Sequence, residues 1–141
     1  MGIAGIVVAN PEMTLDWKTQ YDNWCTPAAA VQILVNLQNG KSLSAESRAL
    51  ILDDLQKSQT GLNRIRHLLP ANTVVADKTG TSGTQDGITA ATNDIALITL
   101  PDGRHLALAV FVADAKASDK IREDTIAQIA RAAWDEWATP K

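Results

Sequence analysis

The sequence has one cysteine, Cys25, among its 141 residues, so no internal disulfide can form and the chain is not a small disulfide-stabilised domain. No apolar run approaches the ~18 residues that a membrane-spanning helix needs. The 13 basic residues are outnumbered by 16 acidic ones, which gives a net charge of −3. The chain therefore lacks the basic footprint of a nucleic-acid-binding protein and the polybasic signal of a membrane-surface protein.

The N-terminal stretch from Met1 to Asn10 is apolar, but it does not resemble a signal peptide. It lacks the basic n-region and the small-residue cleavage site of such peptides. Its isoleucines and valines predict a β-strand over residues 3–9, which Asn10-Pro11 ends. A domain that starts inside a strand suggests a truncated sequence, and no export signal is recognisable in it.

Apolar residues make up 45% of the chain, which excludes wholesale disorder, and the length fits one domain or part of one. Residues 12–24 show no hydrophobic period, yet they include Trp17, Tyr21 and Trp24. We therefore expect a long, ordered loop that aromatic side chains anchor. Long loops in compact domains are usually functional or disordered, and the aromatic residues argue against disorder.

Capping signals delimit a helical region. Thr26-Pro27 supplies an N-cap and a proline for the first turn, and Ser44 is a second N-cap. Asn39-Gly40 and Pro70 end helices. The pattern predicts three helices, over residues 26–40, 44–58 and 62–69, and the first of them buries Val31, Leu34 and Leu37.

The hydrophobic period changes after Pro70. Strand-like segments over residues 73–78, 93–100 and 105–113 alternate with glycine-containing turns, which predicts an antiparallel meander. Residues 118–137 form an amphipathic helix whose apolar face is predicted to hold Ile126, Ile129, Ala130, Ala133, Trp134 and Trp137. The fold class is therefore α+β, an antiparallel meander packed with helices.

Lys78-Thr79-Gly80, followed by Thr81, is the most informative motif. K-T-G is one of three elements of serine β-lactamases and penicillin-binding proteins, beside S-x-x-K and S-D-N. A lysine on an edge strand supplies positive potential, and threonine hydroxyls can hydrogen-bond a substrate carboxylate. The triplet alone is weak evidence, because a lysine at a strand end is commonly a solvated residue that protects the edge.

The surrounding sequence strengthens this assignment. The segments around the triplet closely resemble class A serine β-lactamases, and most of all the extended-spectrum branch with a longer active-site loop. The resemblance is strong over residues 20–141 and loose over residues 1–19. The matching segments are residues 20–24, 60–61, 64–65, 68–70, 74–84, 90–96 and 100–104.

The resemblance implies the C-terminal part of the β-lactamase/transpeptidase-like fold. Residues 1–25 would hold a strand and the active-site loop, residues 26–70 the helical part, and residues 71–141 the antiparallel strands and closing helix. In the family, a serine attacks the lactam carbonyl and a loop glutamate activates the water that hydrolyses the acyl-enzyme. The residues expected to bind the substrate are Lys78, Thr79, Gly80, Thr81 and Ser82.

The general base is less clearly placed. Glu12 is the carboxylate near the start of the loop and is the candidate, but an alignment anchored on Met13 puts Asn10 at the family's glutamate position. An asparagine could orient water without accepting its proton efficiently, so acyl-enzyme would accumulate. Glu12 can also be read as a solvated loop carboxylate without a catalytic role.

Two family elements are absent from the sequence. No serine has a lysine three residues later, and S-D-N does not occur. We therefore expect a half of a β-lactamase that is inactive alone and lacks an N-terminal half. The strand over residues 105–113 would then expose an apolar edge, so the isolated chain is expected to fold poorly, aggregate or need a partner half.

Three readings remain open. The chain is the C-terminal portion of a β-lactamase, a non-catalytic remnant or half that only binds β-lactams, or a fragment of a peptidoglycan transpeptidase. A β-lactam is the expected small-molecule partner, with no nucleic acid or membrane involved. No cofactor or metal is implied, because His67 and His105 have no ligand spacing. The family resemblance implies a periplasmic or secreted protein.

Overall fold

The computed structural model describes residues 2–11 and 16–139. Its centre is a four-stranded antiparallel sheet of β3 (Val75–Thr81), β4 (Thr84–Gln85), β5 (Ile88–Thr99) and β6 (His105–Ala115). β5 pairs with β3 and β4 along one edge and with β6 along the other. The antiparallel meander is therefore confirmed, with strands longer than predicted. β3 extends past the predicted end of its strand at residue 78 and so includes Gly80.

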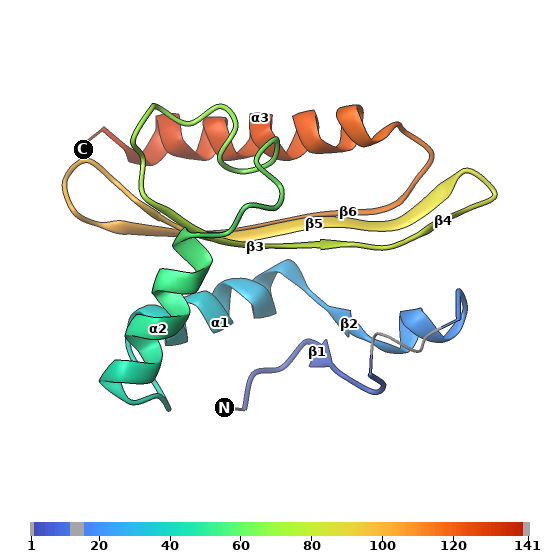
Figure 1. Cartoon of the computed structure of the whole chain (residues 1–141), viewed down its shortest axis with the longest axis horizontal. Helices are drawn as coiled ribbons and strands as arrows, with labels where there is room; N and C mark the ends of the chain where they lie inside the picture. Colours follow the sequence, from blue (N-terminus) through green and yellow to red (C-terminus); the bar gives the residue numbers. More distant parts are fainter. Residues whose placement is uncertain (1, 12–15, 140–141) are drawn as a thin grey trace.

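Helices cover both faces of this sheet (Figure 1). α1 (Pro27–Gln38) and α2 (Ala45–Gln56) lie on one side, and α3 (Asp119–Trp137) lies on the other, together with the connection over residues 57–74. Hydroxyl caps begin the first two helices, as predicted: Thr26 Oγ1 accepts a hydrogen bond from the amide of Ala29, and Ser44 Oγ accepts one from Ser47. The observed layers confirm the α+β class.

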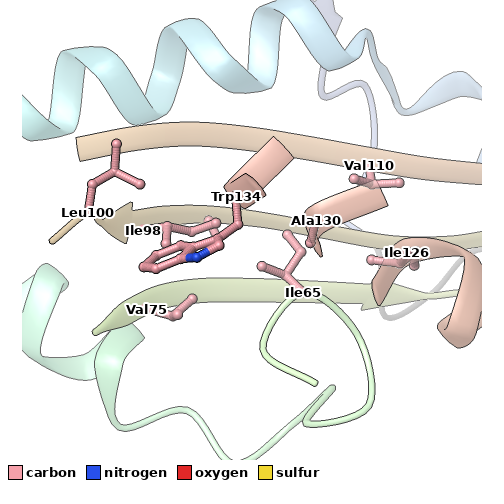
Figure 2. Packing of buried hydrophobic residues seen from close by; sticks show 9 residues of the cluster. Ile65, Val75, Ile98, Leu100, Val110, Ile126, Ala130 and Trp134 are labelled. Carbon is pink, nitrogen blue, oxygen red and sulfur yellow. The ribbon is translucent and has the colours of Figure 1, made fainter. Parts of the chain in front are cut away.

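Two apolar clusters join these layers, because alternate residues of a strand face opposite sides of the sheet. Val75 and Ile98 pack with Ile65 and with Ile126 and Trp134 of α3 (Figure 2). On the other face, the cluster consists of Leu34, Leu37, Ala76 and Leu97. Both faces of β3 are therefore fixed by packing before the strand reaches the K-T-G triplet.

The predicted helix over residues 62–69 is wrong, since this segment forms a series of turns. The amide of Arg64 donates to the carbonyl of Gly61, and the amide of His67 donates to that of Arg64. The amide of Ile65 donates instead to the Asp94 carboxylate, 3.2 Å away. A contact with a distant strand thus replaces the local helical hydrogen bond.

The predicted N-terminal strand is shorter than expected. Only β1 (Ile6–Val7) pairs with β2 (Trp24–Cys25), and the short 3₁₀ helix η2 (Thr19–Asp22) precedes β2. The strand ends early because the amides of Ala9 and Asn10 donate to the side chain of Asn23.

The apolar face predicted for α3 is only partly correct. Ile126, Ala130 and Trp134 are buried, but Ile129 and Trp137 remain 44% and 48% exposed. Ile129 lies to one side of the stripe that faces the sheet, and Trp137 is the last helical residue. No helix within the described ranges has both the length and the apolarity that a bilayer crossing requires.

Candidate functional site

The K-T-G triplet occupies the second half of β3, paired with β5. Thr79 points to the face that carries residues 57–74, where it meets Thr60. Strand alternation then directs Lys78 to the opposite face, and its side chain is exposed. The Lys78 Nζ donates a 2.6 Å hydrogen bond to the carbonyl oxygen of Thr79. This exposed ammonium beside an edge strand can attract an anionic group.

Thr79 is positioned by the turn at Thr60-Gly61. Its hydroxyl shares a 2.9 Å hydrogen bond with that of Thr60. Gly61 has a φ of +66°, and a Cβ at this position would lie 2.2 Å from Thr79 Cγ2. Glycine is needed here for two reasons, since it tolerates the left-handed backbone and leaves room for the threonine methyl group.

Thr81 is held by Arg64, whose side chain is almost fully buried. One guanidinium nitrogen, Nη2, donates to Thr81 Oγ1 at 2.7 Å. Nη1 donates to the carbonyl oxygens of Gly80 and Asn93, at 3.3 and 2.9 Å. Nε forms an ion pair with Glu123 of α3 at 3.1 Å. Arg64 therefore connects β3, β5 and α3 behind the triplet and adds a permanent positive charge there.

Ser82 has a different environment from the two threonines. Its Oγ accepts a 2.8 Å hydrogen bond from the amide of Ala91 and donates to the carbonyl of Gly83 at 2.9 Å. Its own amide donates to the carbonyl of Ala91 at 3.0 Å. The hydroxyl thus stabilises the end of the β3–β5 pairing, which gives Ser82 a structural role beside the triplet.

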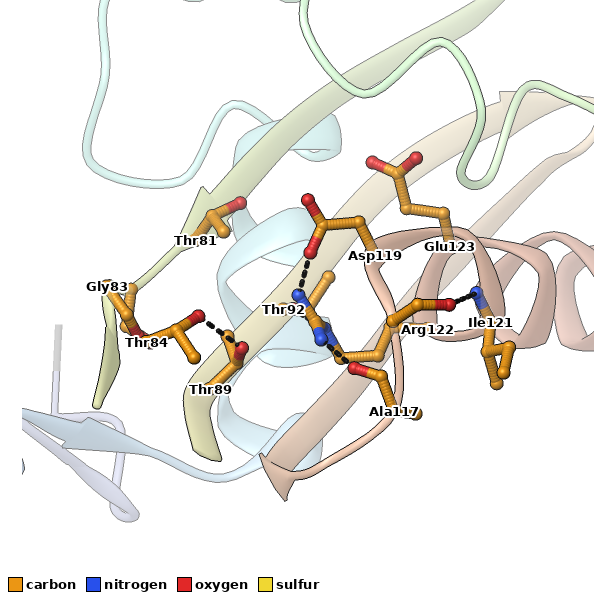
Figure 3. A network of polar contacts seen from close by, with 12 residues as sticks. Thr81, Gly83, Thr84, Thr89, Thr92, Ala117, Asp119, Ile121, Arg122 and Glu123 are labelled. Atoms are coloured by element: carbon orange, nitrogen blue, oxygen red, sulfur yellow. Dashed lines mark hydrogen bonds and ion pairs between the residues drawn. The ribbon is translucent and has the colours of Figure 1, made fainter. Parts of the chain in front are cut away.

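A second arginine network supports β5 from the same side of the sheet (Figure 3). Arg122 Nε donates to Thr92 Oγ1 at 2.8 Å, and its other nitrogens contact Asp119 and the carbonyl of Ala117. Thr92 is the residue opposite Thr81 in the strand register. The two networks anchor both strands at the end of the triplet.

Two buried aspartates, Asp77 and Asp94, lie behind the triplet. Burial and, to a smaller extent, the nearby Asp77 carboxylate together raise the pKa of Asp94 to about 7, although the hydrogen bond from the Ile65 amide and the charge of Arg64 oppose this shift. Burial also raises the pKa of Asp77, while the Arg66 guanidinium opposes that shift. The Arg66 guanidinium forms its ion pair with Oδ1 of Asp77.

The loop side of the site is held by Asn23. Its Oδ1 accepts from the amides of Ala9 and Asn10, at 2.8 and 3.0 Å, and its Nδ2 donates to the Asn10 carbonyl at 2.9 Å. Asn10 Nδ2 also reaches Asp22 Oδ2 at 3.5 Å. Glu12 and Met13 lie outside the described residues, so the choice between Glu12 and Asn10 as the loop residue stays a prediction.

Sequence reasoning identified the triplet but missed the residues that support it. Arg64 and Thr60-Gly61 were matched only as family positions, without a role. A glycine after a threonine suggests a turn, but its contact with Thr79 depends on tertiary structure. In the described ranges, no cluster of three or more histidine, cysteine or acidic side chains could hold a metal ion.

Comparisons with known proteins identify the family. The family model described as "Beta-lactamase enzyme family" matches residues 1–137. Beta-lactamase VEB-1 of Pseudomonas aeruginosa is 46% identical over 92% of this chain and 44% of its own length. Extended-spectrum beta-lactamase PER-1 of the same organism is 45% identical over 95% of this chain and 44% of its own length.

Solved structures give the same result. A β-lactamase from Chitinophaga pinensis superposes with a TM-score of 0.92 at 47% identity and covers 96% of this chain. The TLA-3 extended-spectrum β-lactamase gives 0.95 at 42% identity and covers 98%. In both cases the match covers 51% of the solved chain, so this sequence spans about half the length of its relatives.

These matches and the K-T-G strand define a class of protein, the class A serine β-lactamases. This chain belongs to the β-lactamase enzyme family, and its relatives, which include extended-spectrum members, match it over about half of their own length.

Proposed function

We propose that this chain is the C-terminal, substrate-binding portion of an enzyme that hydrolyses the amide bond of β-lactam antibiotics through an acyl-enzyme, and so confers antibiotic resistance. The observation that carries the proposal is the position of the triplet. Lys78 lies on one face of the edge strand β3, and the Thr79 and Thr81 hydroxyls lie on the other face beside Arg64, so positive charge and hydroxyl groups flank the strand from both sides. Such groups suit the carboxylate of a β-lactam.

The roles of these residues follow from chemistry. Lys78 supplies positive potential, Thr79 and Thr81 offer hydroxyl donors, and Gly80 leaves the strand free of a side chain where the substrate lies. Ser82 directly follows β3 and is the remaining residue proposed to contact the substrate, while its hydroxyl also supports the strand end. Glu12 is the proposed general base for hydrolysis of the acyl-enzyme, with Asn10 as the competing position.

The nucleophile must come from elsewhere. We propose that a further segment, corresponding to the other half of the relatives, supplies the S-x-x-K and S-D-N elements and pairs with β6. In the described ranges, β6 pairs with β5 alone, and most of its side chains are only half-buried. We also propose that the whole protein acts in the periplasm, as the family resemblance implies.

Covalent labelling tests this function. The protein that contains both halves should form a penicillin adduct detectable by mass spectrometry, while the 141-residue chain should form none. A penicillin adduct on the 141-residue chain alone would overturn the proposal that the nucleophile comes from the other half. Absence of both hydrolysis and adduct in the two-half protein would favour the second candidate, a half that only binds β-lactams.

A carboxylate test addresses the triplet itself. Lys78→Ala should weaken β-lactam binding by ~10- to 100-fold, as expected for the loss of a charge-assisted hydrogen bond. A β-lactam methyl ester should bind Lys78→Ala and the unaltered protein equally. Lys116→Ala, which removes an exposed lysine outside the site, is the matched control and should change neither affinity.

A further inference from the structure

The loop and the sheet are connected by a hydrogen bond between residues 93 positions apart. The hydroxyl of Tyr21, in η2, donates to Asp114 Oδ1 at 2.7 Å, near the end of β6. The Tyr21 ring also meets Trp17 edge to face, with ring centroids 6.2 Å apart and planes at 80°. Trp17 and Tyr21 belong to the segment over residues 16–24, here called the aromatic loop, and they share one attachment to the sheet.

Asp114 has an unusual backbone for a strand residue. Its φ is +49°, in the left-handed region that few residues other than glycine adopt. Its neighbours Ala113 and Ala115 keep their pairing with Ala91 and Thr89, so the deviation is local. Backbone strain of this kind persists where surrounding contacts hold it, and it is more common at functional positions.

Asn23, whose side chain holds the backbone of Ala9 and Asn10, lies two residues after Tyr21 in the sequence. The amide of Asn23 donates to the carbonyl of Gln20 at 3.2 Å, which links Asn23 to η2. Asn23 in turn binds the backbone of Ala9 and Asn10. A continuous series of contacts therefore connects the end of β6 to the segment that precedes Glu12.

We propose that Tyr21 and Asp114 are positioning residues, which hold the aromatic loop against the sheet and so set where Asn23 clamps the Ala9–Asn10 backbone. In this way the end of β6 would control the backbone position of Ala9 and Asn10, which the residue proposed to activate water either includes or follows in sequence. That last step rests on the proposed function, whereas the attachment itself can be measured without catalysis.

Amide hydrogen exchange at Ala9 and Asn10 tests the attachment. Tyr21→Phe removes the hydroxyl and keeps the ring beside Trp17, and Asp114→Asn removes the charge with a residue that tolerates positive φ. Each should speed exchange at these amides by ~2- to 10-fold, and the double variant by no more than either single one. Asp86→Asn is the matched control, since Asp86 is exposed with a φ of +52°.

If amide exchange at Ala9 and Asn10 is too fast to measure in every variant, the titration of Tyr21 provides a second test of the attachment. Tyr21 is the single tyrosine of these 141 residues, so tyrosinate absorbance of the two-half protein reports it alone once the tyrosines of the other half are replaced by phenylalanine. The Asp114 carboxylate, through its hydrogen bond, raises the pKa of Tyr21. Asp114→Asn should lower this titration midpoint. An unchanged midpoint, or unchanged exchange in Tyr21→Phe, would overturn the proposal.

Kinetics in the two-half protein separate this proposal from the proposed function. If the loop positions the hydrolytic water, Tyr21→Phe should lower kcat and KM together, because slower deacylation lets acyl-enzyme accumulate while kcat/KM is preserved. A selective loss of kcat/KM would contradict this role. Lack of hydrolysis in every variant would reject the proposed function, and exchange at Ala9 and Asn10 would still decide the attachment.

Discussion

Asp77 and Asp94 form a diagonal pair on one face of β3 and β5, since Asp94 lies opposite Thr79 and Asp77 lies two residues earlier on the same strand. Both side chains are fully buried. Within the described ranges, Asp77 Oδ2 and Asp94 Oδ1 have no hydrogen-bond partner. Arg66 neutralises Asp77, so Asp94 is the carboxyl that retains a proton near neutral pH.

This pair predicts a pH dependence of stability. The pKa of Asp94 is about 7 in the folded chain against an ordinary 3.8, so the folded state binds more protons between these values. The free energy of unfolding should therefore fall as pH rises from about 4 to about 7, by at most ~1.4 kcal/mol per pH unit. Asp94→Asn should flatten this slope in urea denaturation.

Asp102 is the control, because its pKa is lowered by folding whereas that of Asp94 is raised. Hydrogen bonding to Arg104 lowers the pKa of Asp102, so its contribution is present at neutral pH and is lost as pH falls. Asp102→Asn should leave the decline from about pH 4 to 7 in place. An equal slope in Asp94→Asn and the unaltered chain would show that Asp94 ionises normally.

Gly61→Ala should destabilise the chain by ~1–3 kcal/mol, because it adds left-handed strain and a Cβ against the Thr79 methyl group. Adding Thr79→Ser removes that methyl group and should recover the steric part but not the backbone part. Gly83→Ala is the control, with nothing within 4 Å of the new Cβ. Thermal unfolding of the four proteins measures the difference, and equal losses for Gly61→Ala and Gly83→Ala would contradict the prediction.

Arg64→Lys should cost ~3 kcal/mol, since lysine cannot reproduce the fork that binds Thr81 and the carbonyls of Gly80 and Asn93. Arg131→Lys alters a solvent-exposed ion pair with Asp135 and a 3.2 Å hydrogen bond to the Leu68 carbonyl, and it should cost under ~1 kcal/mol. Chemical denaturation distinguishes them. A loss below ~1 kcal/mol for Arg64→Lys would mean that its buried hydrogen bonds are replaced by water.

Trp134→Ala should lower stability by ~3–5 kcal/mol, because this side chain is buried against Ile65 and Ile98. Trp137→Ala, at a position 48% exposed, should cost far less. The same denaturation experiment measures both variants. Similar losses of stability for the two variants would mean that Trp137 also packs on the apolar face, as the sequence predicts.

Local signals predicted much of the fold. Thr26 and Ser44 cap helices where the sequence indicates, and Pro101–Arg104 forms the turn between β5 and β6, in which Gly103 has a φ of +84°. These features depend on neighbours within four residues of each other. The helix expected over residues 62–69 does not form, because Arg64 and Ile65 bind partners on strand β5, which local sequence signals do not reveal.

In the candidate site, too, the sequence predicted some features and only the tertiary structure showed the others. The order of residues in Lys78-Thr79-Gly80-Thr81 and its flanking segments identified the family, because a motif is a property of the linear chain. What holds that motif in place is Arg64, Gly61 and the buried Asp77–Asp94 pair. Only the tertiary structure could show these contacts, since burial, charge proximity and steric fit arise when segments far apart in sequence pack together.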